Sequence, residues 1–571
     1  MIGYIKKHRE LFILLLLLLI LVIIPLSFLR LPSGHDYKYH MGRIYQISEN
    51  IRHGKWFAPI YYEQLSGCGY ASPVFYGDVF LHLPGALVTL GMSVEASLRI
   101  YIMLCLTATA LVTYFCALKL TSEKLPALVT SVLYTFSSYL AIDFITRVAL
   151  GEVQAFIFLP IAFTGLMSIL TGDAKHWLLL PTGLCGVLIS HTLSAACLAF
   201  FFLVIALFYI PELIKNKKRI ALIALSAVIF FALSAFYVFP MLEQLSFGTL
   251  RLNDGTADTI WGTLARRAMP LYKTISDFNL TTANDPWIPN GIGLAIPLSV
   301  GVLIYLLIKK VRVSDKAVLC STLAVIALFA SSTLFPWNSL QSILGKLQFP
   351  WRLLMFVTFF GAFGAGYTLK SLTKKQLVPV FAACLAAFSV FSYCVTAAPK
   401  LKTMINNEIR GVVLEENWHD SLGGAEYLPT GTPWGTMIKN GAVSYTNDTG
   451  IRKTLKTTRD FDVTTVSFTG TAADDAYMKI PLVMYKGYEA RDQNGALRTL
   501  TCERGYVIAD IAGLTDGVIT VKYVGTAIRT VSQIVSMLTF IGIIIYLILR
   551  KTALKRCRRN SPPTADRVSG S

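Results

Sequence analysis

The stretch LFILLLLLLILVIIPLSFL, residues 11–29, decides the fold class of this chain. It contains no charged residue and is long enough to cross a hydrocarbon core of about 30 Å. Lys6, Lys7 and Arg9 precede it, and a signal peptide also begins with basic residues. A signal peptide, however, has a shorter apolar core and a small-residue cleavage site. The stretch therefore predicts an uncleaved first transmembrane helix whose N-terminus stays in the cytoplasm.

Other apolar runs of spanning length follow along the chain. They lie near 98–118, 125–142, 152–170, 176–191, 192–210, 220–241, 291–308, 317–335, 352–369, 376–396 and 530–549. Together with the first run they predict a polytopic α-helical membrane protein with about 12 transmembrane helices.

The composition agrees with a membrane protein. Of 571 residues, 54% are hydrophobic and only 15% are charged, whereas a soluble globular protein has roughly 25% charged residues. Lys and Arg number 52 against 33 Asp and Glu, a formal net charge of +19. Much of this surplus lies in the N-terminus, the short loops and the C-terminal tail. There it sets orientation in the membrane and argues against nucleic-acid binding.

One further apolar stretch, residues 78–93, is short and interrupted by a proline. The basic tail at 550–559 should stay in the cytoplasm with the N-terminus, which requires an even number of crossings. Counting 78–93 as a span makes that number odd and places the basic loops 215–219 and 309–312 outside. We therefore expect 78–93 to lie along the outer membrane face.

This topology leaves four segments outside the membrane, at 30–97, about 243–290, 336–351 and about 397–529. The first is expected to hold juxtamembrane helices. The last has period-two stretches and an Asn494-Gly495 turn, so it predicts an antiparallel, sandwich-like β domain. The period-two residues are Thr464, Val466 and Phe468; Ile480, Leu482 and Met484; Val518, Thr520 and Lys522. The expected organisation is a transmembrane domain at 1–397, a β-rich domain at 398–528, a last transmembrane helix at 529–550 and a basic cytoplasmic tail at 551–571.

A dense group of polar side chains follows the first helix, in GHDYKYHMGRIYQISENIRHG at residues 34–54. Apolar residues recur there at helical spacing, Asp36 stands where a helix N-cap belongs, and Gly54 stands where a helix ends. Asp36, His40 and Arg43 are spaced so that they project from one face of that helix. In one interpretation Asp36 only caps the helix, and His40 and Arg43 contact lipid headgroups. In the other, Asp36 is a general base beside a phosphate-binding histidine and arginine.

Seven short motifs along nearly the whole chain carry a family resemblance. They are HDYKYH (35–40), GCGYASPVFYGD (67–78), RVALGE (147–152), SHTLSA (190–195), QFPWR (348–352), EYLP (426–429) and IPLVMYKGYEARDQNG (480–495). With an acidic residue in the first outer loop, juxtamembrane helices, many spans and an outer C-terminal domain, the chain resembles the GT-C superfamily of integral-membrane glycosyltransferases. More narrowly, it is similar to the bacterial YfhO-like membrane proteins and to the related family labelled 6-pyruvoyl-tetrahydropterin synthase-related. Nothing in the sequence resembles a soluble pterin enzyme.

This resemblance implies a GT-C-type glycosyltransferase, inverting in outcome, with Asp36 as the catalytic base. It implies a sugar donor carried on a polyprenyl phosphate and a cell-envelope glycan, lipid or polymer as acceptor. It also implies a multi-pass protein of the bacterial plasma membrane, in contact with membrane lipids, with both termini cytoplasmic and the active site on the extracytoplasmic face. Transfer from a sugar phosphate passes through an oxocarbenium-like state, and phosphate is already a good leaving group. Such a site needs one base for the acceptor hydroxyl and cations for the phosphate, and no cofactor is required.

Candidate cations lie at the expected depth. Arg352 begins a predicted helix at the outer face, where its guanidinium group could hold a lipid phosphate with two hydrogen bonds. In the alternative interpretation, Arg352 only anchors the helix at the membrane interface beside Trp351. Arg147 and Glu152 flank a short outer turn, and each is costly in lipid unless it is paired or faces a cavity. They either pair with each other or bind phosphate and acceptor. Asp143, near the end of the preceding span, is as consistent with a helix-end carboxylate as with a site residue.

The remaining candidates are histidines and a tyrosine. His191 falls at the junction of two spans, where it is either a hydrogen-bonded structural residue or a substrate ligand. Tyr70 lies in a segment rich in glycine and aromatic residues that suits sugar stacking or an ordinary interface loop. His35, Asp36 and His40 together form the minimum set for a divalent metal site, but the resemblance does not require a metal.

Two of the ten cysteines, Cys68 and Cys502, fall in outer segments and are in principle able to pair. Nothing in the sequence positions them for a disulfide. The sequence has no CxxC motif and no Cys/His spacing typical of zinc.

Two other functions remain open. A transporter or flippase of lipid-linked glycans would also suit about 12 helices, although transporters tend to have repeats and charges at the membrane midplane. A polysaccharide polymerase or ligase would rely on arginines in a large late outer loop, and 251–285 contains Arg251, Arg266 and Arg267.

Overall fold

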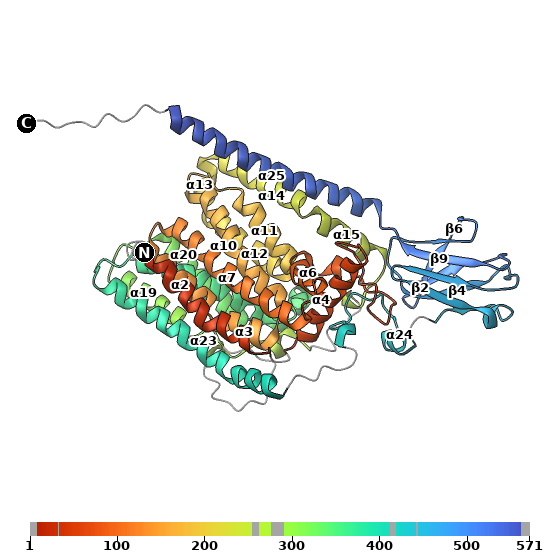
Figure 1. The fold of residues 1–571 in the computed structure, drawn as a ribbon. Coiled ribbons are helices and arrows are strands. Elements are labelled where there is room, and N and C mark those ends of the chain that lie inside the picture. The colour runs from red at the N-terminus through yellow and green to blue at the C-terminus, as the bar shows by residue number, and fades with distance from the viewer. Residues whose placement is uncertain are drawn as a thin grey trace, which may run out of the picture.

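The computed structural model describes residues 8–31, 34–253, 262–275, 291–410, 418–440 and 443–560. Within these ranges the chain is mostly helical, and its strands lie between Tyr445 and Tyr523. The helices form one elongated body, and the strands form a separate domain at one end of it (Figure 1). The predicted class, an α-helical chain with a C-terminal β-rich domain, is confirmed at this level.

Among the described residues, six helices are long and apolar enough to cross a membrane. They are Arg9–Phe28 (α2, η1 and α3), Val94–Thr121 (α7), Leu150–Thr171 (α10), Pro350–Lys370 (η6 and α22), Leu377–Glu408 within α23 (Leu377–Arg410) and Ala527–Thr552 within α25 (Ala527–Asn560). Two bent pairs raise the number to eight if each is one span. They are Lys124–Thr135 (α8) with Ser138–Arg147 (α9 and η3), bent by 41°, and Lys217–Leu233 (α14) with Ala235–Phe247 (α15), bent by 67°.

The predicted number of about 12 spans is not confirmed, because four of the apolar runs form short helices. They are Leu179–Ser190 (α11), Thr192–Phe208 (α12), Ala295–Ile308 (α19) and Asp315–Ser331 (α20). A 12-residue helix such as α11 covers only about 18 Å of a hydrocarbon core that is about 30 Å thick. Apolar composition marks these runs as buried or lipid-facing, but it does not fix where a helix breaks. His191, for example, is extended between α11 and α12.

The segment after the first helix folds into the predicted helix, Tyr37–Arg52 (α4), followed by Gly54 with a φ of +71°. Eleven of the 16 residues of α4 are buried, so most of this helix packs against the rest of the chain rather than lying on the surface. Residues 78–93 form a short turn, Val79–Leu81 (η2), and the eight-residue helix His82–Thr89 (α6), which is too short to cross a membrane. α6 packs on α4 at Gly85, where a side chain would meet Ile47 Cγ2 at 2.5 Å. A one-turn helix, Ser72–Phe75 (α5), lies between α4 and α6 in the chain.

The β domain consists of two antiparallel sheets that enclose an apolar core. The strands are Tyr445–Thr446 (β1), Lys456–Asp460 (β2), Val463–Ser467 (β3), Tyr477–Val483 (β4), Tyr488–Arg491 (β5), Leu497–Arg498 (β6), Leu500–Glu503 (β7), Tyr506–Asp510 (β8) and Val518–Tyr523 (β9). One sheet has the order β1-β4-β8-β7 and the other β2-β3-β9-β5-β6. Val466 and Ile519 from one sheet and Ile480 and Val507 from the other share the core, as in a sandwich. The predicted Asn494-Gly495 turn joins β5 and β6.

The remaining short elements connect these parts. They are Ile210–Lys215 (α13), Arg251–Asn253 (η4), Leu264–Arg267 (α17), Leu271–Ile275 (α18), Trp337–Leu344 (α21), Gly345–Leu347 (η5), Trp418–Asp420 (η7), Trp434–Asn440 (α24) and Arg452–Thr454 (η8). α23 continues past residue 397, where the sequence placed a domain boundary, and α25 continues into the basic tail. α2 begins and α25 ends at the end of the helical body remote from the sheets (Figure 1). Residues 561–571 of the predicted tail lie outside the described residues.

The β domain is fixed to the first outer loop by a shared apolar core. Ile60 and Tyr70 of the loop and Tyr485 of the domain are buried in it, and the Val483 amide donates to the Cys68 carbonyl at 2.9 Å. Cys68 and Cys502 are both free thiols, the first buried and the second exposed.

Candidate active site

Asp36 occupies the N-cap position of α4, as predicted, but its side chain makes no capping hydrogen bond. Its backbone N–H donates instead to the Arg147 carbonyl at 2.8 Å. The carboxylate interacts electrostatically with Arg147, Arg352 and Glu152. Burial raises the pKa of Asp36, and the two arginines oppose that rise. The carboxylate is therefore free of a helix-capping role and faces a group of charged side chains.

A close contact between the backbone at Gly34 and the turn at 146–148 sets the position of Asp36. A side chain at Gly34 would meet the Thr146 carbonyl oxygen at 2.7 Å and Val148 Cγ2 at 2.8 Å. Val148 has a φ of 56°, a conformation that β-branched residues rarely adopt. The turn after η3 therefore packs tightly against the start of α4. A strained backbone at such a contact is typical of functional sites.

The charged group centres on Glu152, in the first turn of α10. Its Oε1 accepts from Arg147 at 2.8 Å and from Arg352 at 3.4 Å, and its Oε2 accepts from the Tyr139 hydroxyl at 2.7 Å. Arg147 also pairs with Asp143 at 2.5 Å. Buried charges are tolerated mainly when they are paired and hydrogen-bonded, and these side chains pair with one another. Asp143 Oδ2 is the exception in the group, because it is buried and has no hydrogen-bond partner among the described residues. Arg147 and Glu152 do pair, and the pair also holds Arg352.

Arg352 keeps part of its guanidinium group available. Its Nη1 donates to Gln348 Oε1 at 2.8 Å and to the Leu347 carbonyl at 3.0 Å, and its side chain is 14% exposed. The guanidinium carbons of Arg352 and Arg267 each lie 5.1 Å from the centroid of the Phe349 ring. Arg352 therefore points into the charged group, and Arg267 packs against the same aromatic ring.

Tyr76 links α4 to this group and was singled out only as one member of the motif at 67–78. Its ring centroid lies 4.4 Å from the Arg43 guanidinium, 6.0 Å from the His40 ring and 6.2 Å from the His191 ring. Burial raises the pKa of Tyr76, and Asp36 adds to the rise, so the hydroxyl lies within electrostatic reach of Asp36. Tyr76 is half-buried and is therefore a candidate to orient a ligand beside Asp36.

His40 and Arg43 are both buried, so neither reaches lipid headgroups. Arg43 Nη2 donates to the carbonyls of Tyr76 and Gly77 at 2.8 Å each, and Arg43 Nη1 lies 3.5 Å from His40 Nδ1. Burial and the Arg43 charge hold the pKa of His40 well below its usual value, so the imidazole is neutral at pH 7. The geometry favours a structural role for Arg43, which holds the backbone that carries Tyr76.

Three other residues were predicted for the site, namely His191, Tyr70 and His35. His191 caps α12 and its Nδ1 lies 2.8 Å from Ser194 Oγ, the hydrogen-bonded arrangement considered as one of its two roles. Tyr70 is fully buried, and its hydroxyl accepts from the Tyr427 amide at 3.2 Å, which removes its ring from contact with a ligand. His35 is exposed beside Asp36. Within the described ranges no group of three or more His, Cys, Asp or Glu side chains is arranged to hold a metal ion.

Glu426 is a site residue that sequence reasoning missed. Burial raises the pKa of Glu426, and the charge of Asp36 raises it further, so the two carboxyl groups lie within electrostatic reach of each other. Tyr39 of α4 interacts with both. The only signal in the sequence was the EYLP motif at 426–429.

An apolar cavity of about 610 Å³ lies beside the site. Its walls come from the first outer loop, α11, α15 and α25 and include Phe57, Gly77, Cys185, Tyr237, Met537 and Ile543. Gly77 follows Tyr76 in the chain, so the cavity borders the segment that carries that tyrosine. The volume is within the range of small-molecule sites, roughly 300–1,000 Å³.

No protein-family model matches the chain. The chain is similar to an uncharacterized protein of Lactococcus lactis subsp. cremoris (strain MG1363), with 24% identity over 608 residues. That alignment covers 96% of this chain and 97% of the relative.

Proposed function

We propose that this chain is a membrane glycosyltransferase of the GT-C type that moves a sugar from a polyprenyl-phosphate-linked donor to a cell-envelope acceptor. The observation that carries the proposal is the placement of Asp36. Its carboxylate makes no helix-capping hydrogen bond and lies within electrostatic reach of Arg147 and Arg352. The backbone N–H of Asp36 donates to the Arg147 carbonyl, which fixes the position of the residue. A base beside cations is the arrangement that transfer from a sugar phosphate requires.

In this reaction the acceptor hydroxyl oxygen attacks the anomeric carbon of the donor. The bond between that carbon and the phosphate oxygen breaks, and the electron pair leaves with the polyprenyl phosphate. Asp36 takes the proton from the attacking hydroxyl. Arg352 and Arg267 offset the negative charge that grows on the departing phosphate, and Glu152 orients Arg352. Attack opposite to the leaving group inverts the anomeric configuration.

The apolar cavity supports a lipid-linked donor, because a polyprenyl chain needs an apolar lining and α25 supplies one wall of it. The arrangement of the chain ends is consistent with an active site on the extracytoplasmic face of a bacterial plasma membrane. α2 begins and α25 ends at the end of the helical body opposite the β domain, and basic residues flank both helices (Figure 1).

The test is sugar transfer from a defined polyprenyl-phosphate sugar by the purified full-length protein. Asp36→Asn should lower the rate by about 10²–10⁴-fold, the usual contribution of a general base. Glu49→Gln, a carboxylate of the same helix that pairs with Arg52, should leave the rate unchanged. Transfer at the wild-type rate by Asp36→Asn would remove Asp36 from the reaction. A wild-type protein that transfers no sugar but moves a lipid-linked glycan across vesicles would be a transporter or flippase.

A polysaccharide polymerase or ligase is the second candidate, because Arg267 from the 251–285 segment packs against the Phe349 ring, as Arg352 does. Such an enzyme would move a lipid-linked oligosaccharide rather than one sugar. The length of the product made from a monosaccharide donor and from an oligosaccharide donor distinguishes the two.

A further inference from the structure

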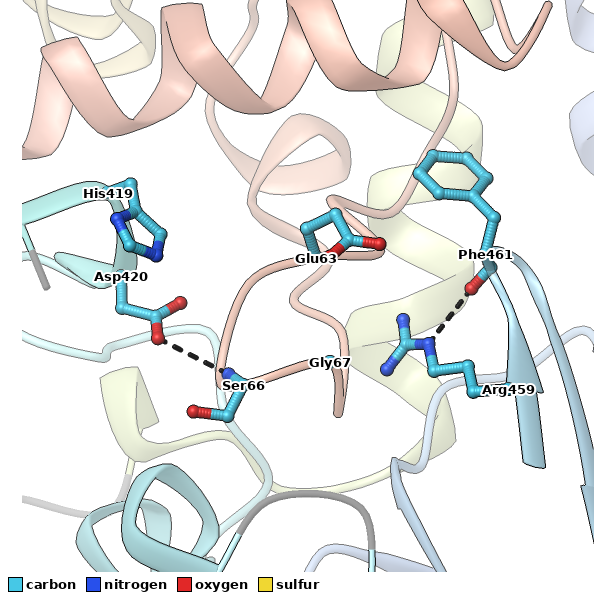
Figure 2. Close-up of a pocket in the computed structure, with 7 residues that line it drawn as sticks. All are labelled: Glu63, Ser66, Gly67, His419, Asp420, Arg459 and Phe461. Carbon is cyan, nitrogen blue, oxygen red and sulfur yellow. Dashed lines mark hydrogen bonds between the residues drawn. The ribbon is translucent and has the colours of Figure 1, made fainter. Parts of the chain in front are cut away.

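A second cavity, polar in character and about 400 Å³ in volume, lies where three distant segments meet. Figure 2 shows its lining, which comes from the first outer loop (Glu63, Ser66 and Gly67), from η7 (His419 and Asp420) and from the β2–β3 hairpin (Arg459 and Phe461). The lining places two carboxylates, an imidazole, a guanidinium and an aromatic ring around one space. None of these residues belongs to the group around Asp36.

Two polar atoms of this cavity are buried without a partner among the described residues. Asp420 is 8% exposed; its Oδ2 accepts from the Ser66 amide at 3.3 Å, and its Oδ1 has no partner in that part of the chain. Arg459 donates from Nε to the Phe461 carbonyl at 3.0 Å and from Nη2 to the Tyr62 carbonyl, and its Nη1 has no partner there. Buried polar atoms in native proteins are almost always satisfied by protein, water or a ligand, so these two mark where an occupant of the cavity would form hydrogen bonds.

The two unpartnered atoms differ in kind, and this difference restricts the ligand. Asp420 Oδ1 needs a donor, whereas Arg459 Nη1 needs an acceptor. An anion would satisfy only the arginine, and a cation only the carboxylates. A hydroxyl group both donates and accepts, so different hydroxyls of one saccharide can satisfy both atoms without adding charge. Phe461 adds an apolar part to the lining; one face of its ring stacks on His53, with centroids 3.8 Å apart, which leaves the other face or the edge for a sugar ring.

The cavity is connected to the active site through α4. Tyr45 of α4 contacts the rings of Trp418 and His419, with centroids 5.8 and 5.5 Å apart. Tyr45 lies nine residues beyond Asp36, which places it about 13 Å along the helix at a rise of about 1.5 Å per residue. A short oligosaccharide spans such a distance. Binding energy gained this far from the reacting atoms can position the acceptor hydroxyl at Asp36.

We infer that this cavity binds a hexose or N-acetylhexosamine unit of the acceptor glycan. Its assignment to the acceptor rests on the proposed transferase function, whereas saccharide binding itself does not. Asp420 and Arg459 hold the ring hydroxyls, and Glu63 and His419 complete the polar lining.

The first experiment measures binding to the purified full-length protein in nanodiscs by titration calorimetry, without any donor lipid. The probes are glucose, galactose, N-acetylglucosamine, and the β1,4-linked disaccharides cellobiose and diacetylchitobiose, with glycine and inorganic phosphate as charged comparisons. At least one saccharide should bind, and Asp420→Asn and Arg459→Gln should each weaken it at least tenfold. Arg452→Gln, an exposed arginine of the same domain outside the cavity, should leave binding unchanged. Glu63→Gln alters an exposed side chain of the lining, so the fold should be preserved, and it should weaken binding at least threefold.

Several outcomes would overturn the inference. They are binding of no saccharide, which leaves water as the occupant; binding of glycine or phosphate alone; and saccharide binding that survives all three substitutions in the cavity. The transferase function is tested separately. Asp36→Asn should abolish transfer and keep saccharide binding, whereas Glu63→Gln should raise KM for the acceptor with little change in kcat. Saccharide binding without any transfer would reject the proposed function and leave the binding site in place. Transfer whose acceptor KM is unchanged in all three cavity variants would reject the inference and leave the proposed function in place.

Discussion

At the scale of single residues, Asp36 combines a helix-cap position with a side chain that is not used for capping. Burial raises its pKa, with Glu152 adding to the rise and two arginines limiting it. A carboxyl group whose pKa is raised in the folded state contributes stability below its ordinary pKa of about 4 and loses that contribution as pH rises through the raised value. The ionised base therefore costs stability at neutral pH, which is a cost typical of functional residues.

The raised pKa of Asp36 predicts how the rate of transfer depends on pH. Because only the ionised carboxylate accepts a proton, kcat/KM should fall on the acidic side, with a midpoint above the ordinary pKa of an aspartate. Asp36→Asn should unfold at the same or a higher temperature than the wild type at pH 7, while its residual transfer loses this acidic limb. The measurements are pH–rate profiles and thermal unfolding of the two proteins. An acidic limb that persists in Asp36→Asn would assign the titration to another group, with Glu426 the first to test.

Sequence reasoning singled out several residues that lie together in the structure, but it did not predict their partners. Asp36, Arg147, Glu152 and Arg352 were predicted and are brought together. Tyr70 was predicted as a ligand and is buried, because the shared core with the β domain covers that loop. That core could not be foreseen, since its members lie hundreds of residues apart and each has an ordinary apolar pattern. The proximity of Glu426 to Asp36 could likewise not be predicted, because the two residues lie in distant parts of the chain.

At the scale of elements, the contact between the start of α4 and the turn at 146–148 sets the position of the base. Gly34→Ala should push the two backbones apart, because its new side chain would lie closer than 3 Å to the Thr146 carbonyl oxygen and Val148 Cγ2. We expect transfer to fall about 10- to 100-fold, since small misplacements of reacting groups have effects of that size. Gly248→Ala is a matched control, because nothing lies within 4 Å of its added atom. Equal activity of the two variants would show that this contact does not position Asp36.

The apolar cavity makes a second prediction at this scale. Met537 of α25 lines the cavity, and Met537→Trp should narrow it and weaken binding of the polyprenyl-phosphate donor at least fivefold. Ile541→Trp places the same side chain on α25 at a residue that does not line the cavity and should have little effect. Donor binding is measured by competition with a fluorescent lipid phosphate. Equal binding by both variants would place the lipid chain elsewhere.

The elements also show where periodicity succeeds and where it fails. The period-two stretches at 464–468, 480–484 and 518–522 coincide with β3, β4 and β9, because each strand has one face in the sandwich core. The apolar run at 176–191 predicted a span and forms the short helix α11. Hydropathy reports burial in protein or lipid alike, so it cannot place a helix break such as the one at His191.

At the scale of the whole molecule, the β domain and the first outer loop should lie on one side of the membrane. Cys502 is exposed on β7, whereas Cys68 is buried in the shared core. A membrane-impermeant maleimide added to intact cells should therefore label Cys502, and labelling should disappear in Cys502→Ser. Partial desolvation raises the pKa of the Cys502 thiol although its side chain is accessible, so labelling should be faster at pH 8.5 than at pH 7. Labelling only after the cells are opened would reverse the proposed orientation.

The contact between Cys68 and Val483 has a consequence for how the protein matures in the cell. The loop that carries Asp36 leaves the ribosome first, and the strand it pairs with follows about 400 residues later. At about 5–20 residues per second, that interval lasts roughly 20–80 seconds. During this time Tyr70 and its neighbours have no partner to cover them. A chain truncated before β4 would therefore expose an apolar surface that chaperones and proteases recognise. Under the proposed function, we expect no transfer by the nascent chain before translation is nearly complete.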